Sequence, residues 1–301
     1  MKLKRTGMTL VEILVVLGII ALMVGLLLPA MTAVKNTAKK AKQQAQLHSI
    51  DIGLMTFKND YGDYPPSENN IGDFCGAQKL AEALLGRDLL GFHPKTDWQA
   101  ISTVYDDPDL SSRKDPYLER ENMNAFHLSE LFNNDELSKS GLSDRFVICD
   151  VFDMKIPQPN GQAVKAGTPI LYYKANTSSN TMDSNDGDFD NLIYNANDNL
   201  SLLKLRSLPS DLTPNGGQDK EIGRPHELAD NDGQFEDIPP NYPYYRPTGM
   251  YFYSPDYKII DKKITSASGI VRPYRPDSYL LISAGADGHY GTYDDICNFG
   301  N

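Results

Sequence analysis

The longest apolar segment of the chain lies close to its beginning. No residue in the range 13–34 is charged, and nearly all are Ile, Leu, Val, Ala, Met or Gly. A helix of about 22 such residues is long enough to cross the hydrocarbon core of a membrane. A secretory signal peptide has a shorter apolar region, of about 7–15 residues, and ends in a small-residue cleavage site. The pattern therefore favours a membrane span over a signal peptide or a buried core helix.

A helical pattern continues after the apolar segment. Residues 35–60 contain no proline, and Ile50, Leu54, Phe57 and Tyr61 recur at spacings that place them on one face of a helix. We expect this face to pack against the rest of the chain. A helix over residues 8–60 would be about 80 Å long, and two helices hinged near Pro29 are the alternative. The opposite face, which we expect to stay polar, carries Lys39, Lys42, Gln43, Gln46 and Asp51.

The rest of the chain has shorter patterns separated by turn-forming residues. Gly62 and the two prolines after Tyr64 end the long helix. Short helices are expected at residues 77–90, with Leu80, Leu84 and Leu85 inward, and at 126–132. Strands are expected at residues 145–152, 169–174, 249–253, 257–260 and 278–283. Loops are expected at residues 176–199 and 209–247, which are rich in Asn, Asp, Gly and Pro. This order predicts an α+β fold in which a small antiparallel sheet packs against the long helix.

Glu12 is a single carboxylate at the edge of the apolar segment. Such a group costs a few kcal/mol to hold in lipid and by default indicates a function. If the chain is cut between Gly7 and Met8, the new α-amino group lies four residues before Glu12, about one helical turn away. The carboxylate of one subunit can then pair with the amine of a neighbour. Glu12 therefore predicts assembly of several copies.

The sequence Lys-Arg-Thr-Gly-Met-Thr-Leu-Val-Glu-Ile-Leu-Val-Val resembles the leader and first helix of type IV prepilins and of type II secretion pseudopilins. In that family a membrane peptidase cuts after the glycine and methylates the new N-terminus. The resemblance implies cleavage after Gly7, methylation of Met8 and an assembly role for Glu12. It also matches Pro29 to a helix-loosening proline of pilins, and Met8 departs from the phenylalanine that is commonest there.

A second segment, Lys-Asn-Asp-Tyr-Gly-Asp-Tyr-Pro-Pro at residues 58–66, is similar to the end of the first helix in major pseudopilins. The resemblance implies a pilin-like fold, a filament of identical subunits, and contacts with the prepilin peptidase, other pseudopilins and the inner-membrane secretion platform. It also implies a single-pass protein of the bacterial inner membrane with its body on the periplasmic or external side. The expected parts are a leader at residues 1–7, a spanning half-helix at 8–34, an amphipathic half at 35–60 and a body at 61–301. Insertions at about 90–245 enlarge that body.

The charge of the chain is uneven. Residues 1–42 carry seven Lys or Arg and one acid, which gives them a net charge of +6. Because the net charge of the whole chain is −11, residues 43–301 have a net charge of −17. Such an acidic body is a poor binder of nucleic acid, which needs clustered basic residues. Cys75, Cys149 and Cys297 allow one disulfide with one thiol left over, or three free cysteines.

An acidic, glycine-rich loop near the C-terminus predicts a calcium site. A strand leads into residues 283–299, where carboxylates at both ends of the loop can converge on one ion. Calcium accepts six to eight oxygen ligands in irregular geometry. The loop also resembles the end of the major pseudopilin, where calcium stabilises the subunit. That resemblance points to Asp287 and Asp295, with Asp294 and Ser283 as further candidates, and a solvated acidic turn is the alternative.

The two other acidic clusters are not expected to bind a metal, and the usual catalytic motifs are absent from the sequence. The clusters at residues 183–190 and 230–237 lack the spacing of an EF-hand, so we expect solvated loops. The sequence has no Gly-x-Ser-x-Gly, P-loop or Cys-x-x-Cys motif, and its histidines show no ligand spacing. We expect a structural subunit of a type II secretion pseudopilus and no catalytic residue. The alternatives are a type IV pilin or minor pilin of a surface filament, and a single-pass anchored binding protein or enzyme that does not polymerise.

Overall fold

The computed structural model describes most of the first half of the chain and separate parts of the second half. The described residues are 10–68, 74–99, 111–119, 121, 123–131, 145–157, 163–179, 193–199, 202, 257–260, 263–266, 274–288, 290 and 294–299. The chain forms two compact units, Met1–Lys42 and Gln43–Asn301. The elements are helices and small antiparallel sheets, so the predicted α+β class is confirmed.

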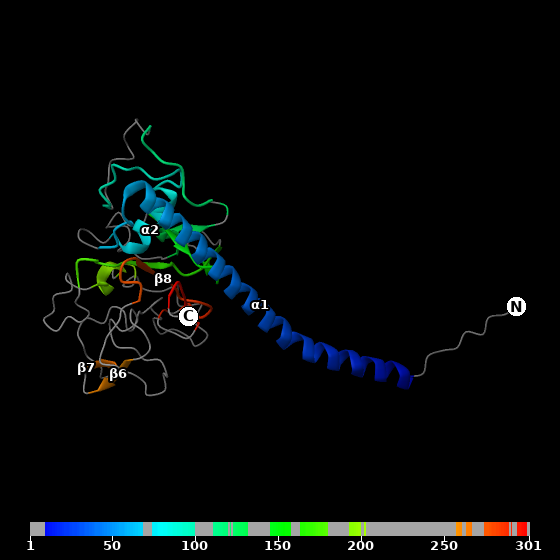
Figure 1. Cartoon of the computed structure of the whole chain (residues 1–301). Coiled ribbons are helices and arrows are strands. Elements are labelled where there is room, and N and C mark those ends of the chain that lie inside the picture. The colour runs from blue at the N-terminus through cyan, green and yellow to red at the C-terminus, as the bar shows by residue number, and fades with distance from the viewer. Residues whose placement is uncertain are drawn as a thin grey trace. The chain divides into compact units, whose positions relative to one another are not determined.

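A single long helix, α1 (Leu10–Tyr61), covers both parts of the predicted helix (Figure 1). The alternative of two helices hinged at Pro29 is therefore wrong. The helix ends at Gly62, which has φ +86°, a conformation that glycine adopts without a steric penalty. Its N–H donates to the Lys58 carbonyl oxygen at 2.7 Å and closes the last turn.

The predicted packing face of α1 is confirmed. Ile50 and Leu54 are 0% exposed and Phe57 is 3% exposed, because they pack against α2 (Gly76–Leu85) and the strands beside it. The prediction of an exposed opposite face holds for Lys42 but is wrong for Gln43 and Gln46.

Gln43 and Gln46 are buried because they bind the backbone at the end of strand β2 (Phe146–Cys149). The Gln43 Oε1 accepts a hydrogen bond from the Val151 N–H at 2.9 Å. The Gln46 Nε2 donates to the Cys149 carbonyl oxygen at 2.9 Å. An amide side chain can satisfy backbone groups that a strand leaves unpaired at its end, and this favours burial of both glutamines.

Helix α2 is shorter and more deeply buried than its sequence pattern predicts. It ends at Leu85 because Gly86 follows with φ +87° and donates its N–H to the Glu82 carbonyl oxygen at 2.9 Å. Every residue of α2 is buried, including Lys79 and Glu82. The predicted inward positions of Leu80, Leu84 and Leu85 are confirmed, because all three are 0% exposed.

Three strands form the central sheet, in the order β5 (Leu171–Lys174), β8 (Tyr279–Ser283) and β9 (Ile296–Cys297). Both pairs are antiparallel, with Leu171 opposite Ile282 and Ser283 opposite Ile296. Successive side chains of a strand point to opposite faces. Tyr172 and Leu281 accordingly join the core cluster of α1 and α2, whereas Leu171, Tyr173, Leu280 and Ile282 join a second cluster on the other face.

Paired short strands form the remaining sheets. They are β1 (Asn124–His127) with β2, β3 (Met154–Pro157) with β4 (Ala163–Ala166), and β6 (Tyr257–Ile260) with β7 (Lys263–Ser266). The other described elements are the one-turn helix α3 (Leu128–Leu131) and the 3₁₀ turn η4 (Ala196–Asn199).

The predicted strands at 145–152, 169–174 and 278–283 are confirmed as β2, β5 and β8 with shorter bounds, and the strand at 257–260 is confirmed as β6 with the predicted bounds. The helix predicted at 126–132 is wrong in its first residues, because Phe126 and His127 pair with β2. The segments at 209–247 and 249–253 lie outside the described residues.

Among the described residues, no helix is both long enough and apolar enough to cross a membrane. This finding does not support the spanning half-helix expected at residues 8–34, which stays a prediction.

Candidate functional site

The residues expected for processing and assembly lie at the beginning of the chain. Gly7 and Met8 are outside the described residues, whereas Glu12 lies exposed in the first turn of α1. A carboxylate in the first turn of a helix interacts favourably with the positive end of the helix dipole, by about 0.3–1 kcal/mol. The structure therefore places a negative charge where a helix tolerates it best.

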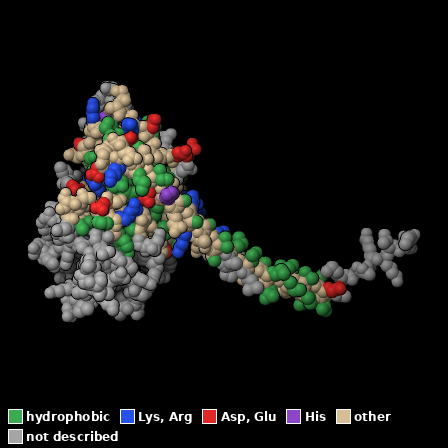
Figure 2. Space-filling model, in the orientation of Figure 1, with side chains coloured by type: hydrophobic (Ala, Val, Ile, Leu, Met, Phe, Trp, Pro, Cys, Tyr) green, Lys and Arg blue, Asp and Glu red, His purple; other side chains and the backbone are tan. Residues whose placement is uncertain are grey.

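The part of α1 that follows Glu12 exposes its apolar side chains to the surroundings (Figure 2). Leu10 is 78% exposed and Val34 is 68% exposed, and Ile13, Leu17 and Leu22 lie between 48% and 67%. A helix that is apolar on all sides is normally covered by protein or lipid. This segment is the largest apolar surface among the exposed side chains that the structure describes.

The C-terminal loop, residues 283–299, brings together two of the acidic residues expected to bind a metal. The Asp287 N–H donates to the Asp294 Oδ2 at 2.8 Å. The turn depends on Gly285, which has φ +71°, because a Cβ there would lie 2.2 Å from the Asp294 carbonyl oxygen. Asp295 lies next to Asp294, directly before β9. These three carboxylates supply the oxygen chemistry that calcium requires.

Ser283 does not belong to that group. Its hydroxyl is buried, donates to the Asp150 Oδ2 at 3.0 Å, and accepts the Gly285 N–H at 3.3 Å. Among the described residues, no group of three or more His, Cys, Asp or Glu is arranged to hold a metal ion. The expected role of Ser283 as a ligand is therefore not supported. The acidic clusters at 183–190 and 230–237 lie outside the described residues.

Asp150, which the sequence analysis missed, organises the base of the C-terminal loop. Its carboxylate is 0% exposed. The Oδ1 accepts the N–H groups of Phe152 at 3.0 Å and Thr168 at 3.1 Å, and the Oδ2 accepts the Ser283 hydroxyl. A Cβ at Gly167 would lie 2.2 Å from the same carboxylate, so this position requires glycine. No local sequence pattern joins residues so far apart in the chain.

The structure describes all three cysteines, and no disulfide joins them. Of the two alternatives, the one without a disulfide is therefore confirmed. Burial raises the pKa of the Cys75 thiol to about 11 and raises that of Cys149 well above its ordinary value. Both thiols stay protonated at neutral pH, which makes them poor nucleophiles and metal ligands.

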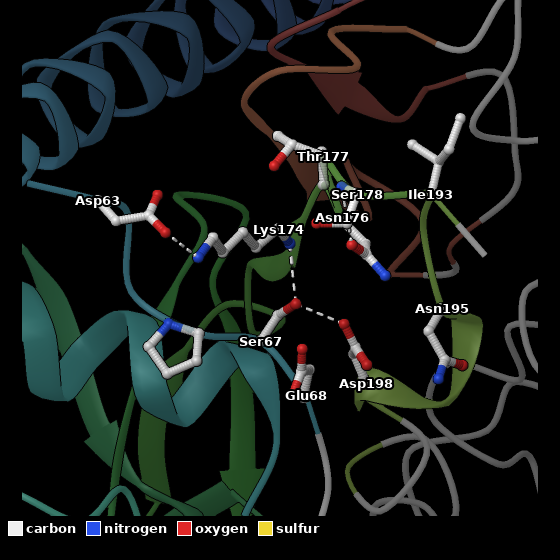
Figure 3. Close-up of a pocket in the computed structure, with 12 residues that line it drawn as sticks. Asp63, Ser67, Glu68, Lys174, Asn176, Thr177, Ser178, Ile193, Asn195 and Asp198 are labelled. Carbon is white, nitrogen blue, oxygen red and sulfur yellow. Dashed lines mark hydrogen bonds and ion pairs between the residues drawn. The ribbon is translucent and has the colours of Figure 1, made fainter. Parts of the chain in front are cut away.

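A pocket of about 490 Å³ lies beyond the end of α1 (Figure 3). It is lined by residues from 63–68, from 174–178 at the end of β5, and from 193–198. Asp198, in η4, is 2% exposed, and its Oδ2 accepts the hydroxyl of Ser67. The Ser67 Oγ in turn accepts the Lys174 N–H at 2.9 Å. The composition of residues 176–199 predicts a loop, and no sequence pattern indicates this pocket.

Comparison with protein-family models, with curated proteins and with solved structures finds no match to this chain.

We predict that Asp150→Ala destabilises the protein by about 3 kcal/mol, because it removes the acceptor of buried backbone and hydroxyl donors. The measurement is urea unfolding of the full chain in mild detergent, followed by circular dichroism. Asp153→Ala is the matched control, because the Asp153 carboxylate forms an ion pair with the exposed Lys165 side chain, an interaction of about 0–1 kcal/mol. Equal losses in the two variants would contradict the structural role of Asp150.

Proposed function

We propose that the chain is a structural subunit of a filament, most similar to the major pseudopilin of a type II secretion system. The observation that carries this proposal is the exposed apolar part of α1 with Glu12 in its first turn. The leader-like residues before it, with Gly7 and Met8, support the same reading. The described α+β body is compatible with a pilin-like subunit, in which a long first helix carries a small antiparallel sheet.

The proposed mechanism is mechanical. The prepilin peptidase removes residues 1–7 and methylates Met8 while the apolar half-helix is held in the inner membrane. The secretion platform and other pseudopilins then bring subunits together, and their helices pack side by side in a filament that pushes folded proteins outward. In lipid the apolar side chains of α1 are already out of water, so side-by-side packing there depends on van der Waals contacts and polar pairs. Outside the membrane, a neighbouring subunit keeps each Leu, Ile or Val side chain out of water, which is worth about 1.5–3 kcal/mol per fully buried side chain.

Glu12 is proposed to select the correct position of an incoming subunit. In an apolar environment an unpaired carboxylate is unfavourable, whereas a carboxylate paired with a cation is tolerated. The cation would be the methylated amine of Met8 on a neighbouring subunit. Wrong registers leave Glu12 without that partner, so the charge pair favours one arrangement over others.

The mass of the N-terminus of the native protein tests this proposal most directly. We expect a chain that begins at Met8 and carries one methyl group on its amine. An intact Met1 would contradict the filament proposal and favour a single-pass anchored protein that does not polymerise. A surface type IV pilin gives the same N-terminus, so deletion of the gene separates it: loss of a pseudopilus should trap secreted proteins inside the cell.

We predict that Glu12→Val is cleaved like the native chain but does not enter filaments, because it lacks the charge that pairs with the neighbouring amine. The measurement is the amount of the variant in sheared or purified filaments, with the cleaved N-terminus checked by mass spectrometry. Glu12→Asp keeps the charge and serves as the control, and it should retain part of the assembly. Normal assembly of the valine variant would rule out the charge pairing.

We propose in addition that calcium binds at the C-terminal loop through Asp287, Asp294 and Asp295. The ion would join the turn at Gly285 to the start of β9 and so hold the C-terminal end against β8. We predict that chelation lowers the melting temperature of the native chain, and that Asp295→Ala gives the same lower value with or without calcium. The exposed Asp115 supplies the control variant, Asp115→Ala, which should keep its response to calcium. A native melting temperature that does not change with calcium would refute the site.

A further inference from the structure

One residue that lines the pocket beyond α1 has a hydrogen-bond acceptor that none of the described residues uses. Asp198 lines the pocket and is 2% exposed. Its Oδ1 is buried and accepts no hydrogen bond from any residue that the structure describes. Buried polar atoms in folded proteins are nearly always paired, so an unpaired carboxylate oxygen at a cavity indicates a missing donor.

The other oxygen of Asp198 is held in place by a chain of hydrogen bonds. The Lys174 backbone N–H donates to the Ser67 Oγ, and the Ser67 hydroxyl donates to the Asp198 Oδ2. Figure 3 shows Ser67 between these two partners. Since the Ser67 oxygen already accepts the Lys174 N–H, its own hydrogen is directed to Asp198. The carboxylate is therefore oriented before a ligand arrives, which reduces the entropy cost of binding.

The charges around Asp198 favour a positively charged ligand. Asp63, Glu68 and Asp198 line the pocket, and Lys174 is the basic residue in the lining. The Lys174 Nζ is engaged by the Asp63 Oδ2 at 2.6 Å. The Lys79 Nζ, which comes from α2, donates to the Glu68 carbonyl oxygen. Both lysine side chains near the pocket thus have an acceptor, and the Lys79 ammonium also attracts the Asp198 carboxylate.

The remaining lining is mostly polar and small. Asn176, Thr177, Ser178 and Asn195 supply side-chain amides and hydroxyls, and no aromatic side chain belongs to the described lining. Such a surface offers hydrogen-bond acceptors and little apolar area. It does not suit an apolar ligand or a stacked base.

We propose that this pocket binds a small organic cation with N–H donors, an alkylammonium or guanidinium ion, through a charge-assisted hydrogen bond to the Asp198 Oδ1. Such bonds between an ionised donor and a carboxylate are about twice as strong as neutral ones. The cation would supply the donor that the buried oxygen lacks and would compensate the negative lining. This site does not depend on the filament proposal.

The proposal gives binding a defined dependence on pH. Burial raises the pKa of Asp198 to about 7; the Ser67 hydrogen bond and Lys79 oppose that rise, and Glu68 adds to it. The other charged groups that line the pocket, Asp63 and Lys174, pair with each other. The cation binds the ionised carboxylate, so affinity should increase as the pH rises through the pKa of Asp198.

The test is an NMR titration of the full chain in mild detergent, with the side-chain carboxyl carbon of Asp198 as the reporter. Methylammonium is the probe, and tetramethylammonium, which has no N–H group, is the control ion. We expect methylammonium to lower the pKa of Asp198 and to bind about tenfold more tightly one pH unit above that pKa than one unit below. Tetramethylammonium should have little effect.

Variants separate the pocket from general effects of charge. Asp198→Asn keeps the shape of the side chain but should abolish methylammonium binding, whereas the exposed Asp115→Asn makes the same change in net charge and should bind normally. An unchanged pKa of Asp198 in methylammonium, or an equal response to tetramethylammonium, would overturn the proposal. Because the pKa titration uses the native chain, it decides the matter even if the Asp198 variant does not fold.

A blocked lysine tripeptide identifies the source of the cation. Tighter binding of the tripeptide than of methylammonium points to a lysine side chain of another polypeptide, and equal or weaker binding points to a free amine. Both results support the site. If neither compound binds, the site is refuted.

Discussion

Burial of both faces of strands β5 and β8 is the constraint on which most of the described body depends. Leu171, Tyr173 and Leu280 need cover on one face, and Tyr172 and Leu281 need it on the other. One helix cannot cover two faces of a sheet, so a separate core cluster lies on each face of these strands. The cluster on the side of Tyr172 includes residues of α1 and α2, which fixes Ile50 and Leu54 of α1 against the sheet. It also explains why α2 has no exposed residue.

Polar contacts then fix the register of these packed layers. Asp51 of α1 accepts the hydroxyl of Tyr279 at 2.7 Å and the Nδ2 of Asn298 at 3.1 Å, and it therefore joins the helix to β8 and to the C-terminal end. Asp150 does the same between β2, β5 and β8 through backbone and hydroxyl donors. Apolar contacts alone tolerate sliding, whereas these directional bonds are satisfied in one arrangement only. Both acids are needed at the junctions between elements.

Periodic features of the body could be predicted from the sequence, and features that depend on distant contacts could not. The spacing of Ile50, Leu54 and Phe57 gave the packed face of α1 because helical periodicity is local. Gln43 and Gln46 look polar in the same pattern, yet they are buried, since their partners at the end of β2 lie about a hundred residues away in sequence. Asp150 and Asp198 could not be predicted for the same reason, because their hydrogen-bond partners Ser283 and Ser67 lie far away in the sequence. The strand β9 was missed because two residues give too little pattern to recognise.

The change of environment along α1 falls between Lys42, which is exposed, and Gln43, which is 0% exposed. From Gln43 onward, side chains at spacings of three and four are covered by the chain's own strands and α2. Before it, the large apolar side chains stay 47–78% exposed. In the described body, Ile52, Met55 and Leu90 are the large apolar side chains that stay exposed, so most of the exposed apolar surface belongs to the first part of the helix. Glu12 lies exposed at the beginning of that part, so a surface that covers it meets a carboxylate as well as apolar side chains. In the proposed filament, a neighbouring copy of the chain would offer both an apolar helix and a terminal amine.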